Sequence, residues 1–200
     1  MDKDIIEGYL GEHLKTLYNS IVNGFEKAIP VIRAGSRIYD QTTKSAIIRD
    51  FIVKEAQKDF QISFFEKKGK LTVLYIENVI IRFKKLNNRL LAGNVPTHQS
   101  KKFSNQNNLP GFSSPTINLN AGYLLNEDGY SIRSVYLTKP KTQYENDWVL
   151  NVGKFVENNL AIPIPPLQKL TSMTPQSSGL KVSVKESAKE MIRKKNVSNE

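Results

Sequence analysis

The stretch LTVLYIENVIIRFKK, residues 71–85, decides the fold class of this 200-residue chain. Its two halves are short and rich in β-branched and aromatic residues, which is typical of β-strands. Glu77 and Asn78 lie between them and have the length of a tight hairpin loop. Together with a preceding strand, QISFF at 61–65, these halves are expected to form an antiparallel meander.

Two helices are expected before this meander. In residues 1–30 apolar side chains recur at spacings of three and four, which places them on one helix face. Pro30 is expected to end this helix, because a proline ring cannot continue the hydrogen-bond ladder. A second helix is expected at about 43–58, capped by Asp40 or Thr42. The stripe of the first helix consists of Ile6, Leu10, Leu14, Leu17, Ile21 and Phe25.

Three more strands are expected after a polar stretch at 86–115. Within this stretch, Pro96 suits the first turn of a short helix over residues 97–106. The sequence Asn-Glu-Asp-Gly at 126–129 is expected to join two of the strands as a hairpin. The three strands are TINLNAGYLL (116–125), YSIRSVYLT (130–138) and DWVLNV (147–152).

These elements predict an α+β fold, with two N-terminal helices packed on a mostly antiparallel sheet of about six strands. Residues 1–158 would form a single domain. Residues 159–200 are expected to form an extended, Pro/Ser-rich C-terminal arm that ends in a basic helix. The apolar face of that helix is thin, so we expect it to become ordered only on a partner.

Composition narrows the classes of function. The chain has 29 Lys and Arg against 19 Asp and Glu, a net charge of +10, which favours a polyanionic partner. It has no Cys, which excludes disulfides, a thiolate nucleophile and Cys-based zinc or iron–sulfur sites. No apolar run approaches the length of a membrane span, and the first residues lack the order of a secretion signal. We therefore expect a cytoplasmic protein without cofactor or membrane partner.

Most of the excess positive charge falls between residues 67 and 102, which hold nine Lys or Arg and a single acid. Side chains alternate along a strand, so Arg82 and Lys84 are expected on one face, about 6–7 Å apart. This spacing is close to that of successive phosphates on a nucleic-acid strand. A solvated sheet face and a site for an acidic protein are the competing interpretations. The candidate nucleic-acid-binding residues are Arg82, Lys84, Lys85, Arg89, Lys101 and Lys102.

Catalytic signals are weak. A metal-free nuclease would use a histidine next to cationic side chains, and His98 precedes Lys101 and Lys102. A metal-dependent nuclease would need Glu77 and further carboxylates near lysines. The competing interpretation of His98 is a polar loop residue. No phosphate-binding glycine loop, nucleophile elbow or zinc motif is present.

The succession IRFKKLNNRL, PTHQ, LPGF and INLNAGYLLNEDGYSIRSVYLTKP, followed by a strand with Trp148, resembles a group of small uncharacterised bacterial proteins. That group is associated with mobile elements and with toxin–antitoxin or phage-defence loci. The resemblance covers about residues 35–150. It implies a role in a bacterial conflict system, and it carries no functional residue over to this chain.

The leading hypothesis is therefore a basic protein that binds RNA or DNA through its phosphates and has little or no catalytic activity. The first alternative is an antitoxin-type inhibitor that wraps an acidic protein with residues 159–200. The second alternative is a small nuclease toxin.

Overall fold

The computed structural model describes residues 2–60, 64–67, 71–76, 78–93, 97–107, 109 and 116–160. The chain divides into two units, Met1–Ile162 and Pro163–Glu200, and all of the described residues belong to the first. Nearly all of the expected C-terminal arm thus lies outside the described residues.

Two long helices begin the chain: α1 (Lys3–Ala34) and α2 (Gln41–Phe60). All six residues of the predicted α1 stripe are buried, and Asp40 caps α2 by accepting a 2.7 Å hydrogen bond from the Thr43 N–H. The prediction that Pro30 ends α1 is wrong, because the helix continues to Ala34. Pro30 is exposed, so water can reach the carbonyl group that it leaves unpaired.

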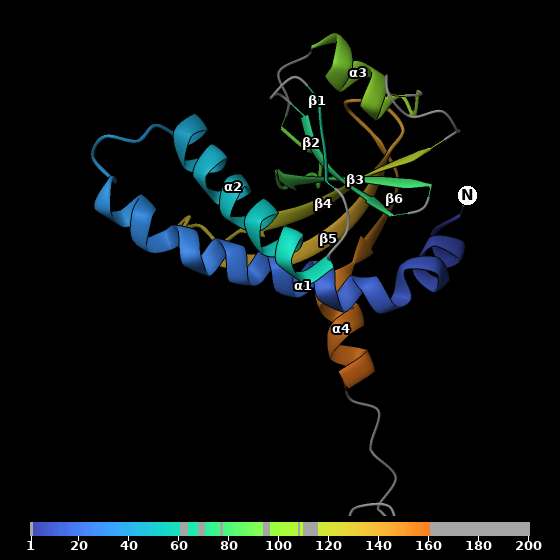
Figure 1. The fold of residues 1–200 in the computed structure, drawn as a ribbon, viewed down its shortest axis with the longest axis horizontal. Coiled ribbons are helices and arrows are strands. Elements are labelled where there is room, and N and C mark those ends of the chain that lie inside the picture. Colours follow the sequence, from blue (N-terminus) through green and yellow to red (C-terminus); the bar gives the residue numbers. More distant parts are fainter. Residues whose placement is uncertain are drawn as a thin grey trace, which may run out of the picture. The chain divides into compact units, whose positions relative to one another are not determined.

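The sheet that follows is mixed. Five strands, β2 to β6, form its main body, and the four-residue β1 pairs with the edge of β2 (Figure 1). The α+β class is confirmed, and all neighbouring strands pair antiparallel except β3 and β4, which are parallel. The strands are β1 (Phe64–Lys67), β2 (Leu71–Ile76), β3 (Val79–Lys85), β4 (Ile117–Leu125), β5 (Ile132–Pro140) and β6 (Asn146–Asn151).

The parallel pairing of β3 with β4 requires a crossover connection, because the chain must return to the start of its neighbour. Residues 86–116 make this connection and carry the short helix α3 (His98–Ser104), which was predicted. Thr97 caps α3 by accepting a hydrogen bond from the Ser100 N–H at 3.1 Å. The helix α3 thus covers one face of the sheet.

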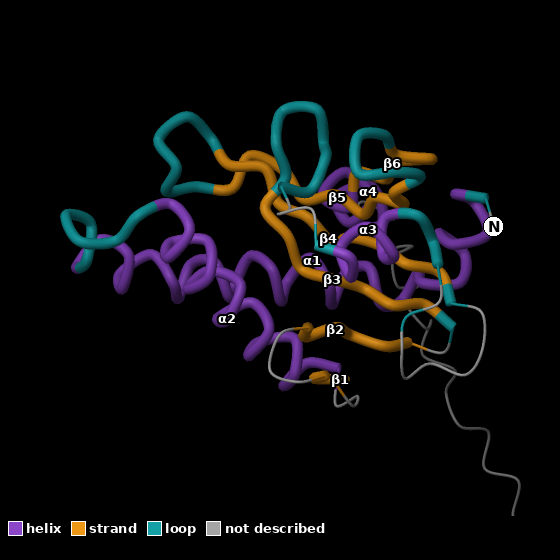
Figure 2. Tube along the Cα trace, turned by 90° about the horizontal axis from the view of Figure 1, so that it is seen from above, coloured by secondary structure: helices purple, strands orange, loops and turns teal. Residues whose placement is uncertain are grey.

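The two faces of the sheet carry different layers. On the helix face, Val79, Ile81 and Phe83 of β3 join the main core with α1 and α2. On the crossover face, Phe103 of α3 packs against Ile80 in a smaller cluster. Figures 1 and 2 show α3 lying across the strands from α1 and α2. Both faces of β3 are therefore buried along most of its length.

A fourth helix, α4 (Val152–Leu160), was not predicted. It follows β6 directly and buries Val152 and Val156 in the main core, near α1 and β5. Val152 was expected to end a strand, and it begins a helix instead.

Candidate functional site

The predicted cationic face of β3 is covered at Arg82. This side chain is only 5% exposed, and its guanidinium carbon lies 3.6 Å from the centre of the Phe103 ring. One guanidinium nitrogen, Nη2, donates a 3.2 Å hydrogen bond to Asn120 Oδ1. The expectation that Arg82 lies on an open face is wrong, because the crossover between β3 and β4 places α3 over it.

Arg82 is buried without a carboxylate partner among the described residues. Its Nε has no hydrogen-bond acceptor there, and burial lowers its pKa to about 10. The Phe103 ring face and the Asn120 amide oxygen supply partial negative charge in place of an acid. Arg82 therefore links α3 to β4 and presents no charge to an external ligand in this conformation.

The last residues of β3 lie beyond this cover. Burial falls along the strand, and Lys84 is half-buried while Lys85 is exposed. Both line a hollow of about 800 Å³ between the N-terminal half of α2 and the end of β3. Arg49 of α2 lines the same hollow, and none of the described side chains around it is acidic. We call Arg49, Lys84, Lys85 and the space between them the cationic hollow.

Positive charge predominates in the cationic hollow, although Lys85 also lines two neighbouring hollows that contain Glu127 and Asp128. Burial, aided by the nearby charges of Arg82 and Arg49, lowers the pKa of Lys84 to about 8. No carboxylate from the described ranges acts in the opposite direction. Arg49 itself pairs with Asp50 at 2.7 Å, but both side chains of that pair are more than half exposed. Solvent therefore screens the neighbouring acid, while Lys84 lacks any described partner.

The hollow also offers neutral hydrogen-bond donors. Thr42 and Ser45 of α2 line it, as does Gln41 at the start of the helix. The positive end of the α2 dipole adds to the potential of the three cations. Cations beside hydroxyl and amide donors form a suitable environment for the oxygens of a phosphate group.

The structure separates the other predicted contacts from this hollow. Arg89 is exposed in the loop after β3, where Asn87 Oδ1 accepts a 3.0 Å hydrogen bond from its backbone N–H. Lys101 and Lys102 lie on α3, exposed and half-buried respectively. None of these three lines the cationic hollow. Of the six predicted residues, only Lys84 and Lys85 are brought together around one cavity.

Sequence reasoning missed Arg49. The apolar spacing of α2 indicated its buried face and gave no sign that Arg49 would lie opposite the end of β3. The feature that would have indicated it is the short pairing of β2 with β3, which covers only Val79–Ile81 and leaves the edge of β3 at Lys84 without a described strand beside it. Such long-range pairing is not visible in local patterns.

The two catalytic candidates, His98 and Glu77, do not belong to any described site. His98 is exposed at the first position of α3, and Glu77 lies outside the described residues. Within the described ranges, no three His, Asp or Glu side chains gather as metal ligands. None of the helices in the described part is both long and apolar enough to cross a membrane.

The chain was compared with protein-family models, with curated proteins and with solved structures. No family model matches it, and neither a curated protein nor a solved structure does.

Proposed function

We propose that this protein binds the phosphate backbone of RNA or DNA in the cationic hollow. The observation that carries the proposal is Lys84, a half-buried ammonium group beside two further cations, with no carboxylate among the described residues that line the hollow. A buried cation without a partner raises the free energy of the empty site. A phosphate oxygen placed between Lys84, Lys85 and Arg49 would lower it.

The ligand that fits best is one recognised by its backbone. Four aromatic side chains near the cationic cluster, Tyr75, Phe103, Tyr123 and Tyr136, are the candidates for stacking on bases. Phe103 and Tyr123 are fully buried, and the half-buried Tyr75 and Tyr136 do not line the hollow. The hollow therefore offers phosphate contacts and little surface for a base. The net charge of +10 adds a long-range attraction for a polyanion. We expect binding that is strongly salt-dependent and nearly independent of sequence.

On the sequence resemblance alone, we further propose that this activity serves a bacterial conflict system, either toxin–antitoxin or phage defence. The antitoxin-type and nuclease alternatives have no described geometry that favours them.

The test is fluorescence anisotropy with labelled single-stranded RNA, single-stranded DNA and duplex DNA over a salt series. We expect Lys84→Glu/Lys85→Glu to weaken binding at least about tenfold. The slope of the logarithm of the binding constant against the logarithm of the salt concentration should fall in magnitude by about one to two. The control is Lys15→Glu/Lys54→Glu, which makes the same charge change at exposed positions of α1 and α2. Equal affinities of the two double variants would refute the site.

Each binding mixture is also run on a denaturing gel, with and without Mg²⁺. We expect the labelled strands to stay intact. Cleavage that His98→Ala or Glu77→Ala abolishes would replace simple binding by the nuclease alternative.

A further inference from the structure

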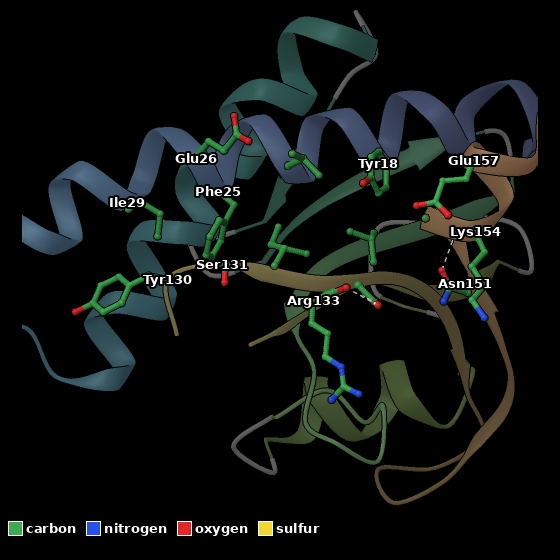
Figure 3. A pocket seen from close by; sticks show the side chains of 15 residues that line it. Tyr18, Phe25, Glu26, Ile29, Tyr130, Ser131, Arg133, Asn151, Lys154 and Glu157 are labelled. Carbon is green, nitrogen blue, oxygen red and sulfur yellow. Dashed lines mark hydrogen bonds between the residues drawn. The ribbon is translucent and has the colours of Figure 1, made fainter. Parts of the chain in front are cut away.

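A second hollow lies on a different part of the molecule. It has a volume of about 570 Å³ and is bounded by α1, the first half of β5 and the start of α4 (Figure 3). It shares no lining residue with the cationic hollow. Its lining carries charges of both signs, with Glu26 and Glu157 against Lys154. A polyanion is therefore not its natural ligand.

The floor of this hollow is an unpaired stretch of strand. β6 pairs with β5 from Tyr136 to Pro140, and its last residue, Asn151, lies opposite Tyr136. The chain then turns into α4, where Asn151 Oδ1 accepts a 3.0 Å hydrogen bond from the Lys154 N–H. Ile132–Val135 of β5 therefore has a strand partner only on the β4 side, within the described residues. The hollow occupies the place where β6 would have continued.

One wall of the hollow is apolar. Tyr18 and Val22 of α1 are half-exposed there, above the buried Phe25. Figure 3 shows Arg133 pointing away from α1, on the other side of β5. An extended chain lying along β5 would thus meet apolar side chains on one of its faces and solvent on the other. This is the environment of a half-buried strand, whose side chains alternate in polarity.

We propose that this hollow binds an extended segment of a protein partner, which adds to the sheet as a strand beside Ile132–Val135. The backbone groups of Ile132–Val135 that do not pair with β4 would supply the affinity. The Arg133 carbonyl already accepts a 2.6 Å hydrogen bond from Ser134 Oγ, which an incoming strand would have to displace. Pockets beside Tyr18 and Val22 would select apolar side chains at alternate positions. The volume suits a single chain of a few residues. A second folded copy would bring its own α1 and α4 against these walls, so a lone segment is the better occupant.

The experiment uses the full-length protein and a phage-displayed library of random ten-residue peptides. Selected peptides are expected to carry apolar residues at every second position. A synthetic copy of the strongest binder should lose at least about tenfold in affinity when alternate backbone nitrogens are methylated, since methylation removes the ladder hydrogen bonds.

Val22→Glu is expected to lower the affinity for the same peptide at least about tenfold, because it places a charge on the apolar wall. Val31→Glu is the matched control, since Val31 is also exposed on α1 and does not line the hollow. If Val22→Glu lowers the melting temperature of the protein, Tyr18→Glu is used in its place. The comparison of methylated with unmethylated peptide uses only the wild-type protein.

Several results would overturn the proposal: no enrichment, selected peptides with helical spacing of three and four, insensitivity to methylation, or equal binding by Val22→Glu and Val31→Glu. Analytical ultracentrifugation tests whether a second copy of the chain occupies the hollow instead. A dimer of the wild type that Val22→Glu dissociates would assign the hollow to a second copy instead.

Discussion

Charge is handled differently in two regions of this protein. Between α1 and α2, the nearly buried Glu55 carboxylate accepts hydrogen bonds from Lys27 and from Lys58, the latter at 2.8 Å. At the end of β3, Lys84 is half-buried with no acid among the described residues to meet it. The first region uses charge to join two helices. The second leaves positive charge unneutralised, which is what a site for an anion requires.

A narrower contrast lies within β3 itself. Arg82 and Lys84 are two residues apart and alternate onto the same strand face, yet α3 covers only the first. Arg82 obtains substitute partners from Phe103 and Asn120, whereas Lys84 has no such partner in the described part of the chain. The difference indicates that Arg82 serves the fold and Lys84 serves a ligand.

The largest effect is expected on stability, at the Glu55 carboxylate between α1 and α2. Glu55→Ala should lower the free energy of unfolding by about 1–3 kcal/mol, because it removes charge-assisted hydrogen bonds to both lysines. Urea denaturation measures this. Asp50→Ala is the control, since the exposed pair of Asp50 with Arg49 should contribute less than about 0.5 kcal/mol. The comparison fails if the two variants lose equal stability.

The next effect concerns pH. Because the pKa of Lys84 in the free protein is about 8, an anion that needs its charge should bind more weakly as pH rises through 8. We expect about a tenfold loss of affinity for single-stranded RNA between pH 7 and 9 at fixed ionic strength. Lys84→Arg keeps its charge over this range and should flatten the profile. Parallel profiles for the wild type and Lys84→Arg would place the titrating group elsewhere.

The smallest effect is expected at Arg82. Arg82→Met should change the dissociation constant for nucleic acid by less than about twofold, whereas Lys84→Met should raise it by about tenfold. Anisotropy titrations at low salt give both values. A loss at Arg82→Met as large as at Lys84→Met would mean that α3 moves aside to expose Arg82 when the ligand binds.

The same contrast shows what local sequence patterns can predict. The apolar periods of α1 and of the strands are local, and they placed these elements nearly correctly. The prediction at Pro30 was wrong because one lost hydrogen bond at an exposed position does not outweigh the burial of Ile32, which follows the proline. The helix α4 was missed because its first residue, Val152, continues the apolar run of the preceding strand and was assigned to that strand.

The candidate site was only partly predictable for a different reason. The alternation of β3 correctly indicated that Arg82 and Lys84 share a face. What that face meets depends on the parallel pairing with β4 and on the crossover that it requires. This non-local choice buried Arg82 under Phe103 and opened Lys84 toward Arg49. Neither outcome is encoded in the spacing of the residues along the strand.

The most direct test is an NMR titration of the Lys84 side chain, followed through its ε-methylene carbon in free protein and in protein saturated with single-stranded RNA. Lys84→Arg identifies the resonance by its absence. We predict a pKa near 8 in the free protein and a rise of at least about one unit in the complex, because the bound phosphate stabilises the ammonium form. An ordinary lysine pKa in the free protein, or an unchanged pKa on binding, would contradict the assignment of the cationic hollow as the phosphate site.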